Sequence, residues 1–532
     1  MKVERNDLAL TVDLGSTGLK VGLVTLDGRM VSWRSATLPT NYGGSAGTGA
    51  ARQDAAAWWE LIEGASAGLM TTVDASRVRA VAVTGQYASV VPVDELGHPV
   101  GDCVMWMDTT GGRTVRERVG GPAAGYRPDA AWSFVRRTGG APSPSGADGA
   151  GGLLSLLTHQ REVVERARWL LEPVDYLVMR FCGVAAATKA SMVGWWLSDN
   201  RRLDGFTYDQ RLLKLLGVEP SVREKLAPLV PFGSIAGAVT DEVARTTGLM
   251  AGTPVLAGAP DLHAAALGAG TTTLGGPGHV ALSTTSWVSA PLARKKTDIL
   301  HSIASVPGLD ERSYLIANNH EIGAKALEWL AGALGPPDGG NTGPARSPAP
   351  VDYDAWTAEA GQAAPGSGRI IFTPWLAGER SPVESHSARG GFHNLSLATT
   401  RPDLVRAVLE GVAYNTRWLA EYVEKFAGAS LAPLRLLGGG ANSRLWCQIH
   451  ADVLGQAVDQ VAEPTVAQLR GMALLAGRTL GVVEAGEVDS LVQLAGRFEP
   501  DEAAHEAYGP LYGEFPGLLK VQTPMFRRLQ RF

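Results

Sequence analysis

Hydrophobic and polar positions near the start of the chain predict a β-hairpin. Residues 8–13 and 20–26 are rich in Val and Leu, and the small residues 15–18 separate them. Two apolar runs joined by a short Gly-containing stretch are typical of antiparallel strands with a tight turn. Residues 55–70 then carry apolar side chains at helical spacing, which predicts a helix with Asp54 as its N-cap.

The pattern of the first hairpin returns later in the chain. Residues 78–84 and 89–93 are strand candidates, and an apolar strand at 254–257 leads to a second strand-turn-strand unit over 279–292. The two hairpins indicate an internal duplication, which predicts an α/β chain of two domains. Stretches rich in Gly, Pro and Ser are expected to be exposed loops: residues 42–51, 139–152 and 335–350.

Length and composition agree with a two-domain globular chain. A chain of 532 residues is too long for one ordinary core, and we place the domains at residues 1–258 and 259–532. The formal net charge of −5 argues against a nucleic-acid partner. The N-terminus lacks the pattern of a signal peptide, and no apolar run approaches the roughly 18 residues of a membrane span, so no membrane partner is expected. Three distant cysteines predict free thiols in a reducing cytoplasm: Cys103, Cys182 and Cys447.

The turn of the first hairpin has the residues of a phosphate site. Glycines such as Gly15 let the backbone approach a phosphate, and the hydroxyls of Ser16 and Thr17 can donate to it. We assign Lys20 to the same nucleotide site. Asp13, at the end of the strand, is a candidate ligand that holds Mg²⁺ through water. The alternative is an ordinary hairpin turn.

Asp261 is the candidate general base. It follows a strand of apolar and small residues and stands among Ala and Pro, where water is limited. A carboxylate in such a place can align and deprotonate an incoming hydroxyl. The alternative is an N-cap for a helix over residues 263–268, and both roles can be combined.

Five segments, in this order, resemble the FGGY family of carbohydrate kinases and among them its xylulokinase-like members: residues 10–28, 173–183, 254–270, 372–417 and 434–458. The resemblance implies two actin-like (ribonuclease H-like) ATPase domains with the active site in the cleft between them. It implies ATP and Mg²⁺ as cofactors, and it makes Asp261 the catalytic base. It also favours a bracing role for Glu379 and Arg380 at the domain junction.

The resemblance assigns further nucleotide contacts to the second domain. Gly438, Gly439 and Gly440, followed by Asn442, resemble the family's adenosine-binding turn. Thr284, Thr285 and Ser286 match the turn of its second phosphate hairpin, although family members usually carry Gly in place of Thr284.

The acceptor site departs from the family pattern. The resemblance assigns Gln86, Tyr87, Trp106, Asp108 and Asp261 to the sugar. Tyr87-Ala88-Ser89 stands where xylulokinases have Met-His-Gly, and Trp106-Met107-Asp108-Thr109-Thr110 lacks the final Arg of Trp-Asn-Asp-x-Arg. Leu262 replaces a frequent Gln or Asn. A polar pocket discriminates strongly between ligands, so the acceptor should not be copied from xylulokinase.

The favoured function is ATP-dependent phosphorylation of a hydroxyl of a small sugar or polyol, with a ketopentose such as xylulose as the favoured class. One alternative is a catalytically weak relative that binds sugar or nucleotide for regulation. Another is an actin-like assembly or chaperone ATPase, which would hydrolyse ATP without sugar. The oligomeric state is left open, with a homodimer as one alternative.

Overall fold

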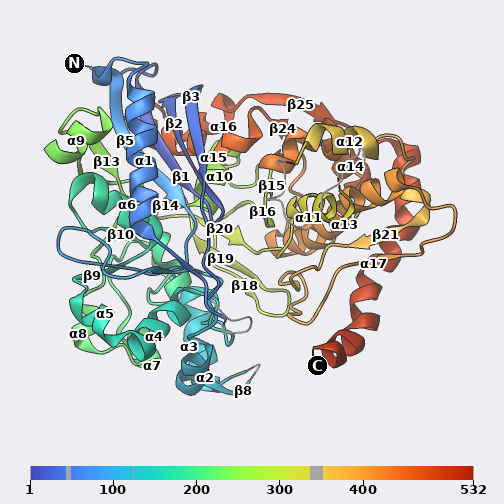
Figure 1. Cartoon of the computed structure of the whole chain (residues 1–532), viewed down its shortest axis with the longest axis horizontal. Helices are drawn as coiled ribbons and strands as arrows, with labels where there is room; N and C mark the ends of the chain where they lie inside the picture. The colour runs from blue at the N-terminus through green and yellow to red at the C-terminus, as the bar shows by residue number, and fades with distance from the viewer. Residues whose placement is uncertain (1, 44–48, 124, 336–350, 531–532) are drawn as a thin grey trace.

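The computed structural model describes residues 2–43, 49–123, 125–335 and 351–530 (Figure 1). Two sheets organise the chain. The first sheet has the order β12 (Ile235–Ala238), β13 (Pro254–Leu256), β5 (Val78–Gly85), β1 (Leu8–Leu14), β2 (Gly18–Thr25), β3 (Met30–Thr37), and β14 (Ala259–Pro260) also pairs with β5. The second sheet has the order β16 (Ser286–Ser289), β15 (His279–Leu282), β23 (Leu434–Leu437), β24 (Val458–Val461), β25 (Leu494–Phe498).

The two sheets share one topology. In each, an antiparallel hairpin, β1–β2 or β15–β16, pairs in parallel with a later strand, β5 or β23. A second parallel strand follows, β13 or β24, and an antiparallel strand completes the series, β12 or β25. The prediction of an α/β chain with two hairpin-containing domains is therefore confirmed.

Helices cover the faces of both sheets. The first part of the chain contains α1 (Ala55–Met70), α2 (Gly112–Val119), α3 (Pro128–Thr138), α4 (Gly149–His159), α5 (Arg161–Arg166), α6 (Pro173–Cys182), α7 (Gln210–Leu216), α8 (Pro220–Arg223), α9 (Asp241–Thr247) and α10 (Asp261–Ala269). The second part contains α11 (Lys325–Leu334), α12 (Tyr353–Ala360), α13 (Arg401–Ala427), α14 (Arg444–Leu454), α15 (Ala467–Thr479), α16 (Val488–Leu491) and α17 (Glu502–Leu529). Among the described residues, no helix is both long enough and apolar enough to span a membrane.

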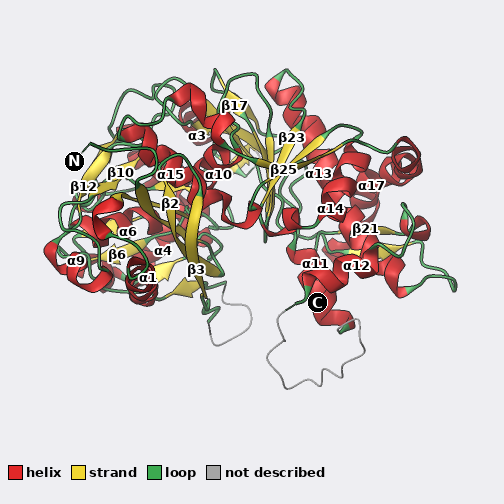
Figure 2. Cartoon of the chain, turned by 90° about the horizontal axis from the view of Figure 1, so that it is seen from above, coloured by secondary structure: helices red, strands yellow, loops and turns green. Residues whose placement is uncertain are grey.

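Helices α10 and α15 lie between the two sheets (Figures 1 and 2). They approach closely because both carry glycine where they meet. A Cβ on Gly268 would lie 1.8 Å from the carbonyl oxygen of Ala467, and one on Gly471 would lie 2.1 Å from that of Ala264. Helix α15 also packs on β1 and β5, although it belongs to the second part of the chain. This packing fixes α10, whose first residue is Asp261.

Most local predictions agree with the structure, and one loop is wrong. Helix α1 spans the predicted residues, and the Asp54 side chain accepts from the N–H of Ala56 at 2.9 Å. The strand predicted at 89–93 is shorter, β6 (Val91–Val93). Helix α4 begins inside the predicted loop 139–152, because the Asp148 side chain caps it through the N–H of Gly151. Residues 44–48 and 336–350 of the other two predicted loops lie outside the described residues.

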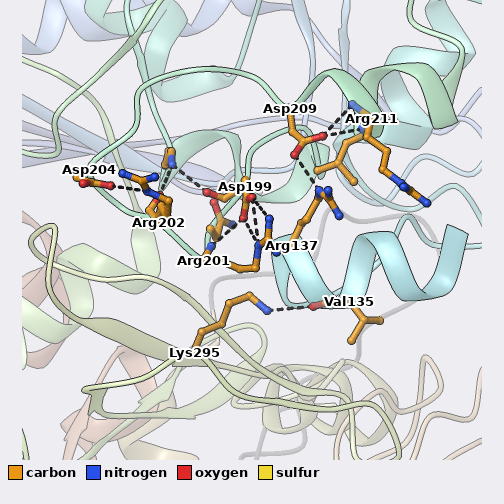
Figure 3. Close-up of polar contacts among 12 residues, drawn as sticks. Val135, Arg137, Asp199, Arg201, Arg202, Asp204, Asp209, Arg211 and Lys295 are labelled. Atoms are coloured by element: carbon orange, nitrogen blue, oxygen red, sulfur yellow. Dashed lines mark hydrogen bonds and ion pairs between the residues drawn. The ribbon is translucent and has the colours of Figure 1, made fainter. Parts of the chain in front are cut away.

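A further sheet joins the two halves of the molecule. Its order is β17 (Pro291–Leu292), β20 (Tyr314–Ala317), β19 (Ile303–Pro307), β18 (Thr297–Asp298). Figure 3 shows Lys295, in the loop before β18, donating to the carbonyl oxygen of Val135 in α3 at 2.9 Å. The Tyr314 hydroxyl donates to the carbonyl oxygen of Asn200 at 2.9 Å. The three cysteines are buried free thiols, as predicted.

Candidate active site

The turn of the first hairpin is closed by its own backbone. The N–H of Gly15 donates to the carbonyl oxygen of Gly18 at 2.9 Å, and a Cβ on Gly15 would meet the same oxygen at 2.9 Å. Glycine is therefore required at position 15, where the backbone comes too close to Gly18 for a Cβ. Thr17 is exposed at the tip.

The Ser16 side chain connects this turn to two predicted acceptor residues. Its hydroxyl donates to Oε1 of Gln86 at 3.1 Å and accepts from the indole N–H of Trp106 at 2.9 Å. The Gln86 side chain is buried, and its Nε2 has no hydrogen-bond partner among the described residues. A buried amide without a partner fits a site that a polar ligand completes.

Strand register brings two carboxylates to one edge of the first sheet. Asp13 is in register with Thr84 of β5, and Ala259 of β14 is in register with the same Thr84. The strands are parallel, so their carboxyl ends meet at this edge. Asp13 is buried and pairs with Lys20, whose Nζ lies 3.1 Å from Oδ2.

Asp261 lies two residues beyond Ala259, as the first residue of α10. Its Oδ1 accepts from the N–H of Leu262 at 2.8 Å, whereas the N-cap position is held by Pro260. The N-cap interpretation of Asp261 is therefore wrong by one position, because the helix begins earlier than predicted. Burial, and then the negative charge of Asp13, raise the pKa of Asp261 from 3.8 to about 7.

Tyr87 lies within electrostatic range of Asp261. Burial and the charge of Asp261 raise the pKa of the phenol above its usual value, and the positive charge of Arg380 opposes the shift. Arg380 comes from the second half of the chain. Its Nε bonds Glu321 at 3.0 Å, while Glu379 accepts from Asn415 at 2.6 Å, so Glu379 and Arg380 do not bond each other through their side chains.

Asp108 is buried with every acceptor position occupied. Oδ2 accepts from the N–H of Ala51 at 2.7 Å and from the Arg52 guanidinium, while Oδ1 accepts from the N–H of Thr110 at 2.9 Å and from its hydroxyl. A carboxylate offers about four lone-pair sites, and these four hydrogen bonds use all of them, so no site remains for a hydroxyl of a sugar substrate. Arg52, which the sequence did not mark, places its guanidinium on the carboxylate of Asp108.

The turn of the second hairpin lies against the turn formed by Gly438, Gly439 and Gly440. The turn occupies residues 283–285, with Thr284 exposed, while Ser286 is a buried residue of β16. The prediction that Ser286 belongs to the turn is wrong, because the strand begins one residue earlier. Thr285 is partly buried. Gly438 has a φ of 91°, and a Cβ there would lie 2.5 Å from Ser283 Oγ.

Gly439 and Gly440 differ in their surroundings. A Cβ on Gly439 would meet nothing within 4 Å, whereas one on Gly440 would lie 2.6 Å from Leu282 Cγ. Asn442 is exposed and donates to Thr465 Oγ1 at 2.7 Å. Gly439 therefore leaves an open backbone surface, and Gly438 and Gly440 hold the turn against the second hairpin.

Gly438→Ala is expected to weaken both the fold and nucleotide binding. The left-handed backbone and the contact with Ser283 oppose a methyl group, with an expected loss of about 1–3 kcal/mol in the free energy of unfolding. Denaturant unfolding and ATP titration measure the two effects. Gly439→Ala is the control for stability, since its Cβ enters open space. Equal stability losses in the two variants would contradict this account.

The comparisons with known proteins agree over nearly the whole chain. Residues 8–268 match the model of the FGGY family of carbohydrate kinases, N-terminal domain, and residues 290–480 match that of the C-terminal domain. The chain is 28% identical to the xylulose kinase of Escherichia coli (strain K12), over 97% of this chain and 99% of that protein. It is 27% identical to the erythritol kinase of Brucella abortus (99% and 98% covered) and 23% identical to the gluconokinase of Bacillus subtilis (98% and 97%).

A comparison with solved structures gives the same result for the fold. The crystal structure of ligand-bound xylulose kinase from Lactobacillus acidophilus matches with a TM-score of 0.81 at 20% identity, over 98% of this chain and 99% of that one. The three relatives described above carry three different names, so they agree on the class of reaction and not on one substrate. The chain belongs to the FGGY family of carbohydrate kinases and is an ATP-dependent sugar kinase with the family's two-domain fold.

Proposed function

We propose that Asp261 is the general base of this kinase. The observation that carries the proposal is a carboxyl with a pKa of about 7, at the edge of the sheet where Gln86 and Tyr87 also lie. A base near this pKa is matched to neutral pH. The Asp261 carboxylate takes the proton of the acceptor hydroxyl while the oxygen of that hydroxyl bonds to the γ-phosphorus of ATP. The bond between that phosphorus and the ADP oxygen breaks, and ADP leaves.

The residues around Asp13 fit a magnesium ion. Burial, and second the negative charge of Asp13, raise the pKa of Asp261, and a divalent cation beside Asp13 would relieve the repulsion between the two carboxylates. Among the described residues, no group of three or more His, Cys, Asp or Glu could hold a metal ion, and Mg²⁺ is usually held by one or two carboxylates with water and phosphate oxygens. Bound there through Asp13, Mg²⁺ would neutralise phosphate charge. Lys20 keeps Asp13 oriented.

We further propose that the nucleotide lies between the two hairpins. Because the Ser16 hydroxyl is engaged by Gln86 and Trp106, and the N–H of Gly15 is engaged by Gly18, phosphate binding by the first turn falls to the backbone N–H of Ser16 and to Thr17. Thr284 and Thr285 serve the second turn, and the open backbone at Gly439 receives the adenine. The boundary proposed at 258/259 lies at the start of β14, which leads to Asp261.

The acceptor is proposed to be a small sugar or polyol other than D-xylulose, within the ketopentose and polyol class. Ala88 has a shorter side chain than the His of xylulokinases, Ser89 adds a hydroxymethyl group where they have Gly, and Asp108 is committed to Arg52. Initial rates with D-xylulose, other ketoses, alditols such as erythritol, and sugar acids such as D-gluconate test this. We expect a ketose or polyol other than D-xylulose to have the highest kcat/KM. A maximum for D-xylulose would show that these changes do not affect specificity.

A further inference from the structure

A buried carboxylate that the reaction does not use lies beneath the acceptor site. Glu172 immediately precedes α6, and its side chain is fully buried. Oε1 accepts from the N–H of Ala88 at 2.9 Å, and Oε2 accepts from the N–H of Ser89 at 3.1 Å. The indole N–H of Trp195 also donates to Oε1. Two of the three donors therefore belong to one short segment, residues 86–89, which we call the acceptor turn.

The acceptor turn has a backbone shape that needs support. Ala88 has a φ of 62°, in the left-handed region that residues with a Cβ rarely adopt. The turn is held at its start by the N–H of Gln86, which donates to the carbonyl oxygen of Leu14 at 2.7 Å. Beyond Ala88, Ser89 Oγ accepts from the N–H of Trp106 at 2.9 Å. Glu172 binds the strained residue and its neighbour between these two points.

We propose that Glu172 is a positioning residue for the sugar acceptor. By binding two consecutive N–H groups, its carboxylate fixes the acceptor turn, and with it Gln86 and Tyr87, at the edge of the sheet that carries Asp261. The inference rests on the proposed function of this site. Only a carboxylate offers acceptors on both oxygens, so a neutral amide of the same shape cannot make all three bonds.

Glu172→Gln tests the inference. The amide group must turn its N–H₂ toward at least one N–H donor, which frees part of the acceptor turn. We expect the dissociation constant of the acceptor, measured by calorimetry without ATP, to rise about tenfold or more. The dissociation constant of ATP should stay within about twofold, since the turn does not hold the nucleotide. D-xylulose serves as the probe, or erythritol or D-gluconate where wild type turns it over faster.

Asp175→Asn is the matched control. Asp175 is a fully buried carboxylate on α6 that accepts from Ser191 Oγ at 2.9 Å and does not touch the acceptor turn. It should lower thermal stability without changing acceptor binding. If Glu172→Gln lowers only stability, or if both variants weaken acceptor binding equally, Glu172 is merely structural and the inference is overturned.

Gly194→Ala reaches the same turn from the other side and serves if Glu172→Gln does not fold. A Cβ on Gly194 would lie 2.4 Å from the Ala88 Cβ, so the acceptor turn must move. We therefore expect this variant, too, to bind the acceptor more weakly while it keeps its affinity for ATP. Gly205→Ala, whose Cβ meets nothing within 4 Å, is its control. Normal acceptor binding by Gly194→Ala would overturn the inference. A wild-type protein that phosphorylates none of the acceptors would instead contradict the proposed function.

Discussion

Asp261→Asn is expected to lower kcat by about 10² to 10⁴ while leaving ATP binding nearly unchanged. The amide is almost isosteric, so the hydrogen bond from the N–H of Leu262 to Oδ1 can be kept. What is lost is the group that accepts the proton of the acceptor hydroxyl. Steady-state rates with the best acceptor, together with calorimetric titration of ATP, measure the two effects separately.

The control is again Asp175→Asn, which changes a fully buried carboxyl away from the proposed chemistry. It should keep kcat within about threefold of wild type, since effects of substitutions away from the site act mainly on stability. If Asp261→Asn keeps more than about a tenth of the wild-type kcat, Asp261 is not the base.

Activity is expected to fall about tenfold per pH unit below pH 7, as the Asp261 carboxyl takes up a proton. Burial raises the pKa of this group to about 7, so the basic form is lost as pH decreases through that value and is fully present above it. The profile of kcat/KM for ATP reports the enzyme before the nucleotide and its Mg²⁺ are bound, and it should show this limb. A profile that is flat from about pH 5 to pH 8, in protein that stays folded, would contradict the assignment.

Glu379 is a second carboxyl that titrates in this range. Burial raises its pKa to about 8, although hydrogen bonds from Asn415 and from the N–H groups of Arg380 and Glu321 oppose the shift. Glu379→Gln separates the two groups. The acidic limb should remain in that variant, and it should vanish from the residual activity of Asp261→Asn.

Local patterns in the sequence predicted an α/β chain of two domains, while the actin-like arrangement of those domains was implied by the family resemblance. The hairpins β1–β2 and β15–β16 are apolar runs around small residues, and α1 has both helical spacing and its cap. Helix α4 could not be predicted, because its Gly-rich start reflects close packing. A Cβ on Gly149 would lie 2.4 Å from the ring of Trp195, and one on Gly151 would lie 2.0 Å from the carbonyl oxygen of Gly146. Such contacts have no local signal.

The site could be predicted only in part for the same reason. Motifs led to Ser16, Gln86 and Trp106, which the structure brings into one hydrogen-bonded group. Arg52 was missed because it meets Asp108 across 56 positions of the chain. Glu172 was missed because its partners in the acceptor turn lie 83 and 84 positions away. A lone buried acid has no sequence signal until its donors are placed.

The most direct test of phosphoryl transfer to a small acceptor is to measure ADP and phosphate ester together. ATP with each acceptor, followed by phosphorus NMR, gives both products in one sample. We expect wild type to form one phosphomonoester of the acceptor for each ADP, and to form little ADP when no acceptor is present. We expect Asp261→Asn to lose both products. ADP released at the same rate with and without acceptor, with inorganic phosphate as the other product, would contradict the account and would indicate an ATPase.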